Sequence, residues 1–178
     1  MIRLAPTIAA VLFPVAVFAA GEESPTPPTP TETTVECTDG QVWDDASKSC
    51  VAPQESSLDD DTLFRAAREF AYAGQPQAAI GALEAMSDPT EDRVLTYLGF
   101  ANRKLGRQDI AMGYYQAALT RNPDNLLARS YMGQGYVEIG DIALAQAQLR
   151  EIRTRGGRQT WAEVSLAQAI RSGKGYSY

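Results

Sequence analysis

A set of residues recurs at intervals of about 34 positions in the second half of this chain, and no other feature constrains its fold as much. The recurrence is clearest when the chain is aligned on Gly74, Gly106 and Gly140, which lie 32 and 34 residues apart. Positions at fixed distances from these glycines then share a residue type, as in Ala79, Ala111 and Ala145, in Leu83, Tyr115 and Leu149, and in Met86, Ala118 and Ile152. Such a period indicates repeated units of secondary structure that stack on one another.

Each unit carries the signals of two consecutive helices. The three glycines are expected to end the first helix of a unit in a left-handed turn, which a residue without Cβ adopts at little cost. Pro76 and Asp141 suit the start of a second helix. Pro123 cannot continue the helix that is expected to end near Arg121.

Small residues mark where the two helices of a unit approach each other. Ala67, Gly99 and Gly133 occupy equivalent positions in the period, and larger residues such as Phe70 and Tyr136 follow three positions later. The pattern therefore predicts pairs of antiparallel helices that cross closely at the small residues.

This arrangement resembles the tetratricopeptide repeat, in which W-x2-L-G-x2-Y is followed by A-x3-F and then by proline. The central repeat, about 92–125, supplies the matching residues, which are Leu98, Gly99, Ala111, Tyr115, Ala118 and Pro123. The repeats at about 60–91 and 126–159 are looser copies, and the chain departs from the pattern at Asn102, Arg129 and Gly157. The resemblance implies an all-α fold, a short helical-hairpin solenoid of about three repeats. The alternative is a helical bundle whose periodicity is fortuitous.

A further helix is expected at 160–171, after the third repeat. Thr160 and Glu163 form a capping box, and an apolar stripe follows at Trp161, Val164, Ala167 and Ile170. Repeat arrays need a terminal helix to cover the last core face, so we assign the whole of 58–172 to the repeat domain. The tail at 173–178 gives no interpretable signal.

The first 19 residues have the layout of a secretory signal. Arg3 precedes a charge-free apolar run, and Val17 and Ala19 supply the small residues that favour cleavage after Ala19. The alternative is a membrane anchor, but the run is shorter than the roughly 20 apolar residues that span a bilayer, and Pro14 interrupts it. We therefore expect a periplasmic or secreted protein with no stable membrane insertion after cleavage.

A proline- and threonine-rich linker is predicted at 20–36. It has almost no apolar residues, and the region 20–57 holds eight acidic residues but only one base, Lys48. Such a composition buries too little surface to offset the entropy of ordering, so we expect a disordered, acidic tether.

The two cysteines, Cys37 and Cys50, are predicted to form a disulfide because the chain is expected to be exported. Residues 37–51 then form a small hairpin around a turn at 44–47, with a stability separate from that of the repeats. This segment also resembles a fragment of small extracellular chitin-binding modules. Two roles are therefore open for Trp43. Its ring either stacks on a sugar or packs against the disulfide.

Charge and residue types exclude several classes of function. Residues 58–178 hold 14 acids and 14 bases, so the chain lacks the basic field that nucleic-acid binding requires. Histidine is absent, and no arrangement of residues specifies a nucleophile, a general base or a phosphate loop. We expect a protein that is not an enzyme, with no cofactor and no metal.

The resemblance implies binding on a concave face built from the first helix of each pair. The residues expected there are Asp61, Phe64, Arg68 and Tyr72, then Arg93, Thr96, Phe100, Arg103, Lys104 and Arg107, then Leu127, Ser130, Gln134 and Glu138. Aromatic residues and arginine carry much of the energy of interfaces. We therefore expect a protein or peptide partner that is acidic and has an apolar anchor, which would meet Phe100 or Tyr72.

Two functions remain open. The first is an exported scaffold for a protein partner in envelope assembly, for which the acidic leader around Val35 would compete as an internal ligand. The second is an adaptor that binds cell-wall or other glycan through the Cys37–Cys50 hairpin. The sequence specifies neither the partner nor the oligomeric state.

Overall fold

The computed structural model describes residues 29–55 and 58–176, and this part of the chain is mostly helical. The predicted signal at 1–19 and most of the predicted linker lie outside the described residues. The elements in chain order are α1 (Glu32–Val35), β1 (Val42–Asp44), β2 (Ser49–Val51), a 3-10 turn (Pro53–Glu55), α2 (Asp60–Tyr72), α3 (Pro76–Glu84), α4 (Asp92–Lys104), α5 (Gln108–Arg121), α6 (Leu126–Glu138), α7 (Ile142–Thr154) and α8 (Trp161–Ser172). None of the described helices is long and apolar enough to cross a bilayer.

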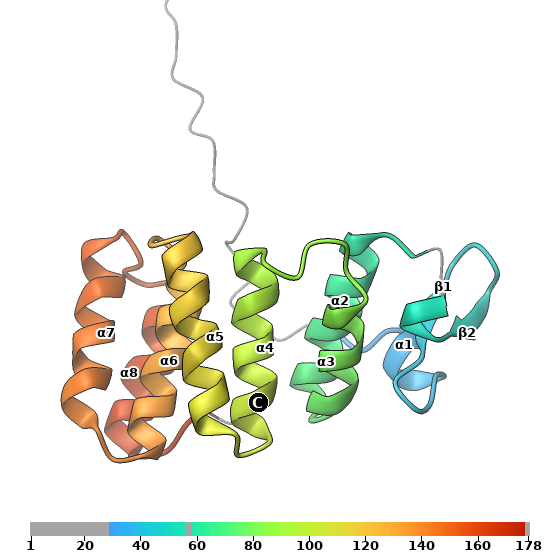
Figure 1. The fold of residues 1–178 in the computed structure, drawn as a ribbon. Helices are drawn as coiled ribbons and strands as arrows, with labels where there is room; N and C mark the ends of the chain where they lie inside the picture. Colours follow the sequence, from blue (N-terminus) through green and yellow to red (C-terminus); the bar gives the residue numbers. More distant parts are fainter. Residues whose placement is uncertain (1–28, 56–57, 177–178) are drawn as a thin grey trace, which may run out of the picture.

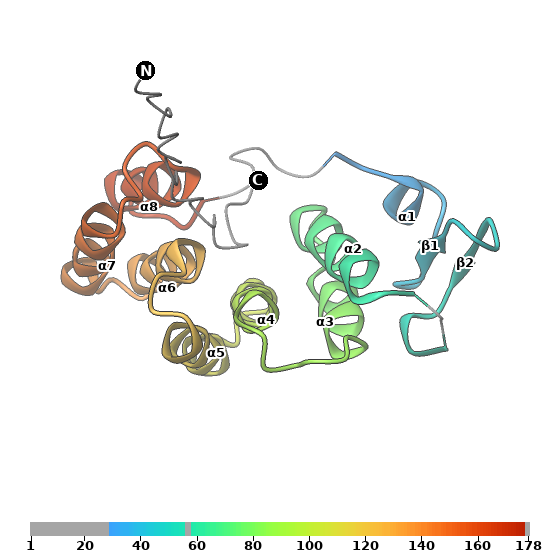
Figure 2. The same cartoon turned by 90° about the horizontal axis from the view of Figure 1, so that it is seen from above.

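Helices α2 to α7 form three consecutive hairpins, and α8 follows the third (Figure 1). Seen from above, the helices lie along a curve, with α2, α4, α6 and α8 on its inner side and α3, α5 and α7 on its outer side (Figure 2). The hairpins expected at 60–91, 92–125 and 126–159 and the helix expected at 160–171 are all present.

The same turn ends the first helix of each hairpin. Gly74, Gly106 and Gly140 have φ angles of 75°, 74° and 82°, which confirms the predicted left-handed turns. In each case the amide of the next residue donates a hydrogen bond to a carbonyl five positions earlier, at 2.8 Å for Gln75 to Phe70, 2.9 Å for Arg107 to Asn102 and 2.8 Å for Asp141 to Tyr136. These bonds satisfy carbonyl groups that the helix end would leave unpaired.

The helix starts also match the sequence signals. Pro76 is the first residue of α3, and the side chain of Asp141 accepts a hydrogen bond from the amide of Leu144 at the start of α7. Thr160 caps α8 by accepting from the amide of Glu163. The carboxylate of Glu163 accepts from the amide of Gln159 rather than from that of Thr160, so the capping box is displaced by one residue.

The predicted close crossings are present, but one involves a different helix. A Cβ atom on Gly99 would lie 2.5 Å from the ring of Tyr115 on α5, as expected for the two helices of one hairpin. At Gly133 the neighbour is Leu166 of α8, 2.6 Å from such a Cβ, and not a residue of α7. The terminal helix therefore packs directly on the inner helix of the third hairpin.

The N-terminal cysteines form a disulfide, and the predicted hairpin around it is confirmed. The sulfur atoms of Cys37 and Cys50 are 2.07 Å apart, and β1 pairs antiparallel with β2 with Trp43 opposite Cys50. Val42 is fully buried in the same hydrophobic core as residues of α2 to α6. The hairpin is therefore attached to the first helical pair, which argues against the separate stability expected from the sequence.

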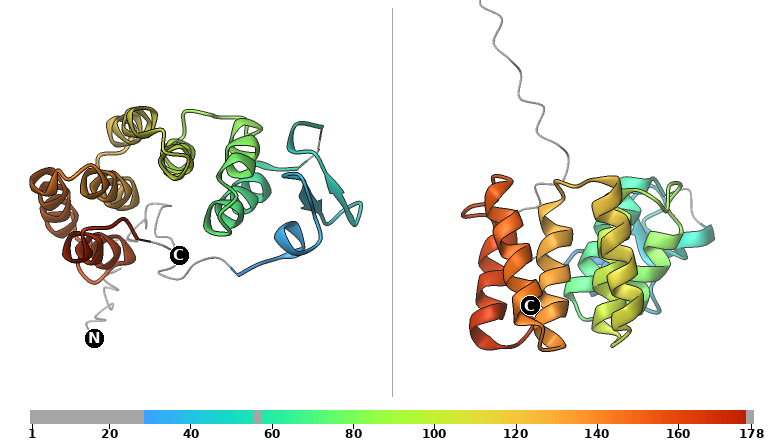
Figure 3. Two further views of the ribbon diagram at one scale, coloured as in Figure 1. Left: turned by 90° about the horizontal axis from the view of Figure 1, so that it is seen from below. Right: turned by 60° about the vertical axis from the view of Figure 1, so that its left-hand side comes forward.

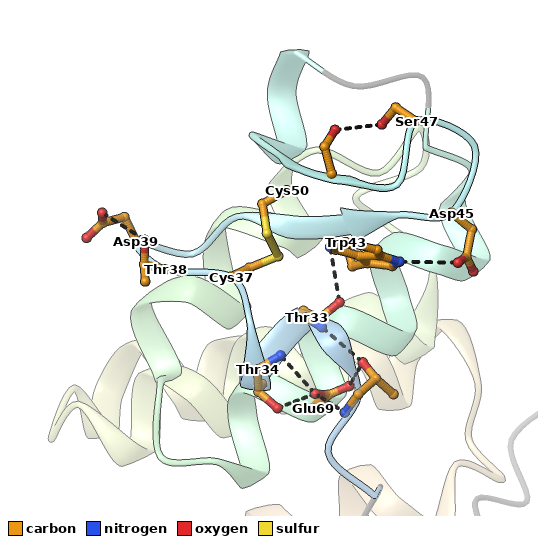
Figure 4. Close-up of a disulfide and its surroundings, with 12 residues drawn as sticks. Thr33, Thr34, Cys37, Thr38, Asp39, Trp43, Asp45, Ser47, Cys50 and Glu69 are labelled. Carbon is orange, nitrogen blue, oxygen red and sulfur yellow. Dashed lines mark hydrogen bonds between the residues drawn. A yellow bond between two sulfur atoms is a disulfide. The ribbon is translucent and has the colours of Figure 1, made fainter.

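The end of the predicted linker is ordered, which corrects the expectation of a disordered tether for that part. Thr31 caps α1, and the carboxylate of Glu69 on α2 accepts hydrogen bonds from the amides of Thr31 and Thr34 at 2.8 and 3.2 Å. The hydroxyl groups of both threonines donate to it as well (Figure 4). Hydrogen bonds to a buried carboxylate supply the energy that the composition of this segment lacks.

Candidate functional site

The inner faces of α2, α4 and α6 share a cluster of aromatic side chains. Its members are Phe64, Tyr72, Tyr97, Phe100 and Tyr131, with ring centroids 5.4 Å apart for Phe64 and Tyr97, 5.9 Å for Tyr72 and Phe100, and 4.8 Å for Phe100 and Tyr131. The hydroxyl groups of Tyr72 and Tyr131 are 2.7 Å apart. Sequence reasoning missed Tyr97 and Tyr131, although they are one period of 34 residues apart.

Several residues predicted to line an open groove are buried instead. Phe100, Ser130 and Gln134 are fully buried, and Phe64, Thr96 and Leu127 are nearly so. The reason is that neighbouring inner helices pack side by side, so their facing side chains fill the space between them. Phe100 therefore belongs to the core of the inner row and is not an exposed anchor point for a partner.

The predicted inner-face cations are joined to carboxylates and aromatic rings of the chain itself. Arg93 forms ion pairs with Asp61 at 3.0 Å and Glu91 at 2.7 Å, and it lies over the ring of Phe64. Partial burial lowers the pKa of Arg93, but its hydrogen bonds to Glu91 and Asp61 outweigh that effect and raise it overall. These pairs hold Arg93 in a fixed orientation beside α2.

Arg103 is buried on the inner face of α4. It pairs with Glu138 of α6 and lies over the ring of Phe100. The next residue, Lys104, is exposed and lies over the same ring. Loss of hydration where its amine packs on this face, together with the charge of Arg103, lowers the pKa of Lys104. Arg107, predicted for this face, is exposed at the start of α5, with Nη1 3.5 Å from the side-chain oxygen of Asn102.

Arg68 joins the inner row from α2. Its Nε donates to the hydroxyl of Tyr97 at 3.2 Å. The predicted Arg68, Arg103 and Lys104 thus all contact rings of the aromatic cluster, to which the predicted Tyr72 itself belongs.

The C-terminal segment Lys174–Tyr176, which carries no interpretable sequence signal, lies on this same face. Lys104 Nζ donates to the carbonyl oxygen of Tyr176 at 3.1 Å, and the amide of Tyr176 donates to Gln134 Oε1 at 3.1 Å. The ring of Tyr176 meets that of Trp161 edge to face, with centroids 4.9 Å apart. The chain after α8 turns toward the inner side of the curve, as the view from above and that from below both show (Figures 2 and 3).

A buried polar network orients the amide of Gln134 toward this segment. Its Nε2 lies 3.4 Å from Ser130 Oγ and 3.5 Å from Ser165 Oγ, and these two hydroxyl groups are 3.0 Å apart. Because the amide nitrogen faces the hydroxyl groups, the oxygen is directed at the backbone of Tyr176.

A second candidate site lies beside Trp43 at the other end of the molecule. Trp43 is half-buried, its Nε1 donates to Asp45 at 3.2 Å, and its amide donates to Thr33 Oγ1 at 3.2 Å (Figure 4). A cavity of about 240 Å³ adjoins it, also lined by Thr31, Glu32, Thr62, Arg65, Ala66 and Glu69. Trp43 therefore contributes both to the packing of the hairpin and to the wall of a polar hollow.

The residues that the structure describes do not provide a metal site. They contain no group of three or more cysteine, aspartate or glutamate side chains placed to hold a metal ion. Comparison of the chain with models of protein families and with curated proteins found no match. Any functional assignment must therefore come from the geometry of the two candidate sites.

Proposed function

We propose that this protein is an exported scaffold of the tetratricopeptide type, which binds a protein or peptide partner on the inner side of its curved helical array. Its place is the periplasm or the extracellular space, and its task is the assembly or organisation of the cell envelope. The proposal includes no catalytic activity.

The repeated hairpins support the fold assignment within this proposal. The small residue Gly99, the left-handed turns at Gly74, Gly106 and Gly140, and the period near 34 all agree with a tetratricopeptide solenoid. The Cys37–Cys50 disulfide agrees with export, because disulfides persist in oxidising compartments.

One observation carries the proposed function: the inner face already holds a piece of non-helical chain. Lys104 and Gln134 bond the carbonyl and amide of Tyr176, and these are the two groups that every peptide presents. A surface that binds main-chain groups in this way is suited to a peptide segment of a partner.

The proposal extends to the chemistry of the partner segment. We propose an apolar anchor and an acidic character, as the inner-face residues suggested. The internal pairs of Arg93 with Asp61 and of Arg103 with Glu138 neutralise part of the positive charge, so they weaken the argument for an acidic partner. Since Phe100 is buried, the half-buried Tyr72 is the residue that would meet the apolar anchor.

The test is capture of a partner from the envelope fraction by the mature chain, compared with variants of the inner and outer faces. We expect Arg68→Ala combined with Lys104→Ala to weaken the captured complex at least about tenfold, or 1.4 kcal/mol. Arg150→Ala on the exposed outer helix α7 should leave it unchanged. Equal binding by all three proteins, with unchanged helicity, would refute binding on the inner face.

A second candidate function rests on the cavity beside Trp43, which is lined by Asp45 and Arg65 as well. An aromatic ring with neighbouring polar groups suits a sugar, so the hairpin would act as an adaptor for cell-wall or other glycan. Co-sedimentation with insoluble chitin or peptidoglycan tests it. Loss of binding in Trp43→Ala and retention in Arg68→Ala with Lys104→Ala would favour this function over the first.

A further inference from the structure

The C-terminal segment occupies its place on the inner face through a turn that directs it there. Gly173 adopts a left-handed conformation with φ 69°. Ser172 Oγ donates to the carbonyl oxygen of Lys174 at 3.1 Å and accepts from its amide at 3.3 Å. The turn at 172–174 thus reverses the chain at the end of α8 and returns it to α4 and α6.

The residues that receive Tyr176 form a seat of three parts, which we call the Tyr176 seat: Lys104, Gln134 and Trp161. Lys104 and Gln134 form hydrogen bonds with its backbone, and Trp161 contacts its ring. Gln134 is fully buried and held by the Ser130 and Ser165 hydroxyl groups, so it is oriented before any ligand arrives. Two main-chain contacts do not discriminate among residues, whereas the Trp161 contact selects an aromatic side chain.

The preceding residue restricts what can occupy the seat. A Cβ atom on Gly175 would lie 2.0 Å from Glu138 Oε1 and 2.9 Å from its Cδ. Glu138 in turn is fixed by Arg103 and by Gln108, whose Nε2 donates to its Oε2 at 3.2 Å. The seat therefore accepts glycine followed by an aromatic residue, which is the sequence that this chain presents.

We propose that the Tyr176 seat is the specificity site of the inner face, that its ligand is an extended partner segment with glycine before an aromatic residue, and that the protein's own tail competes for it. The proposal rests on the proposed function, since it names the partner segment that binds to the same face. It also replaces the acidic leader by the C-terminal tail as the internal ligand, because the described part of the leader is bound at Glu69 instead.

Tethering makes the competition effective even though each contact is weak. Two hydrogen bonds and one ring contact are weak in water, so a free hexapeptide would bind with a dissociation constant on the order of 1 mM. A tethered segment has an effective concentration in the millimolar range, which is enough to occupy the seat. A partner displaces the tail when it adds contacts elsewhere along the inner face.

The experiment uses the full chain in a Trp43→Phe background, in which Trp161 is the one remaining tryptophan. In one protein the tail is unchanged, and in the other it carries Tyr176→Ala and Tyr178→Ala, so that no aromatic residue follows Trp161. The probe is a synthetic peptide with the sequence of residues 173–178. We expect the tail variant to shift Trp161 emission to longer wavelength, and the peptide to reverse the shift with a dissociation constant on the order of 1 mM.

Three controls decide the interpretation. The same peptide with alanine for the tyrosine equivalent to Tyr176, and the peptide with alanine for the glycine equivalent to Gly175, should each bind at least about tenfold more weakly. The protein with its natural tail should bind the unaltered peptide at least about twofold more weakly than the tail variant does, because a tethered competitor whose effective concentration equals its dissociation constant fills half of the seats. Circular dichroism establishes that the two proteins have equal helicity.

The inference is overturned if Trp161 emission does not change in the tail variant, if the peptide binds both proteins equally, or if sedimentation shows that the natural tail binds a second copy instead. These outcomes are distinguishable from failure of the proposed function, because capture of a partner by the inner face is measured separately with the Arg68 and Lys104 variants. Conversely, suppose that the peptide binds but the inner face captures no partner. The Tyr176 seat would then be supported as a peptide-binding site, and the proposed scaffold function would be refuted.

Discussion

The ring of Tyr115 lies directly against the backbone of Gly99, where an added Cβ atom would be 2.5 Å from Tyr115 Cε1. Both residues are buried between α4 and α5. We expect Gly99→Ala to lower the free energy of unfolding by about 1 to 3 kcal/mol, because the ring cannot move away without disturbing the core. Chemical denaturation followed by circular dichroism measures the change.

Gly113 provides the matched control for this prediction, since it also lies inside a helix. A Cβ atom there would meet no atom within 4 Å, so Gly113→Ala should stabilise the protein by about 0.5 to 1 kcal/mol. If the two substitutions have the same effect, the crossing at Gly99 is not as close as the structure indicates.

The disulfide is expected to stabilise the helical array as well as the hairpin. Cys37→Ser with Cys50→Ser removes a link that closes a loop of 14 residues, for which the entropic contribution is about 3 kcal/mol. Because Val42 is buried in the core of the array, we expect the helical melting transition to fall by about 6 to 12 °C, at about 2 to 4 °C per kcal/mol for a protein of this size.

Reductant serves as the control for the disulfide. It should lower the melting temperature of the natural protein and leave that of the double variant unchanged. The intact mass of the exported protein should be two hydrogens below the reduced value. An unchanged helical transition in the variant would show that hairpin and repeats are independent after all.

Glu69 is expected to hold the segment before the hairpin in place. Its carboxylate accepts hydrogen bonds from Thr31 and Thr34, so Glu69→Ala should release α1 from α2. We expect the amide of Thr34 to exchange with solvent at least about tenfold faster, which corresponds to 1.4 kcal/mol. Glu84→Ala, at an exposed position on α3, is the control and should not change that rate.

The pH dependence of stability should report on Tyr115. Burial raises the pKa of Tyr115 to about 12 from its ordinary value of 10.0, and the charge of Arg103 offsets only part of this. The folded state therefore favours the neutral hydroxyl. The resulting contribution to stability is complete below pH 10 and is lost as the pH rises from 10 to about 12.

Comparison with Tyr115→Phe isolates this contribution from that of the other groups that titrate in the same range. The stability of the natural protein relative to the variant should fall by up to about 3 kcal/mol between pH 9 and 12. Urea denaturation at a series of pH values measures it. A constant difference between the two proteins would mean that the hydroxyl of Tyr115 is in contact with water.

The local elements of this fold were determined by the sequence. The turns at Gly74, Gly106 and Gly140, the helix starts at Pro76 and Asp141, and the disulfide-closed hairpin follow from the conformational limits of single residues and from short-range spacing. Such signals act within a few residues, so they predict where helices begin and end without knowledge of distant neighbours.

The tertiary structure decided which residues of the inner face are buried and which are exposed. Helical periodicity places Phe100 and Gln134 on faces that look away from the second helix of their hairpins. Only the packing of α4 beside α2 and α6, and of α6 beside α4 and α8, shows that both side chains are buried. Burial depends on contacts between segments that are far apart in sequence, and the period of one helix contains no information on them.

Two segments near the ends of the described chain also owe their order to residues that are distant in sequence. The composition of 20–36 predicts disorder, yet Thr31 and Thr34 are ordered by Glu69, a residue 38 and 35 positions away. The tail at 173–178 has no periodicity to interpret, and Tyr176 is placed by Lys104, Gln134 and Trp161. Short polar segments gain their order from the surfaces on which they lie, and those surfaces exist only once the helices have packed.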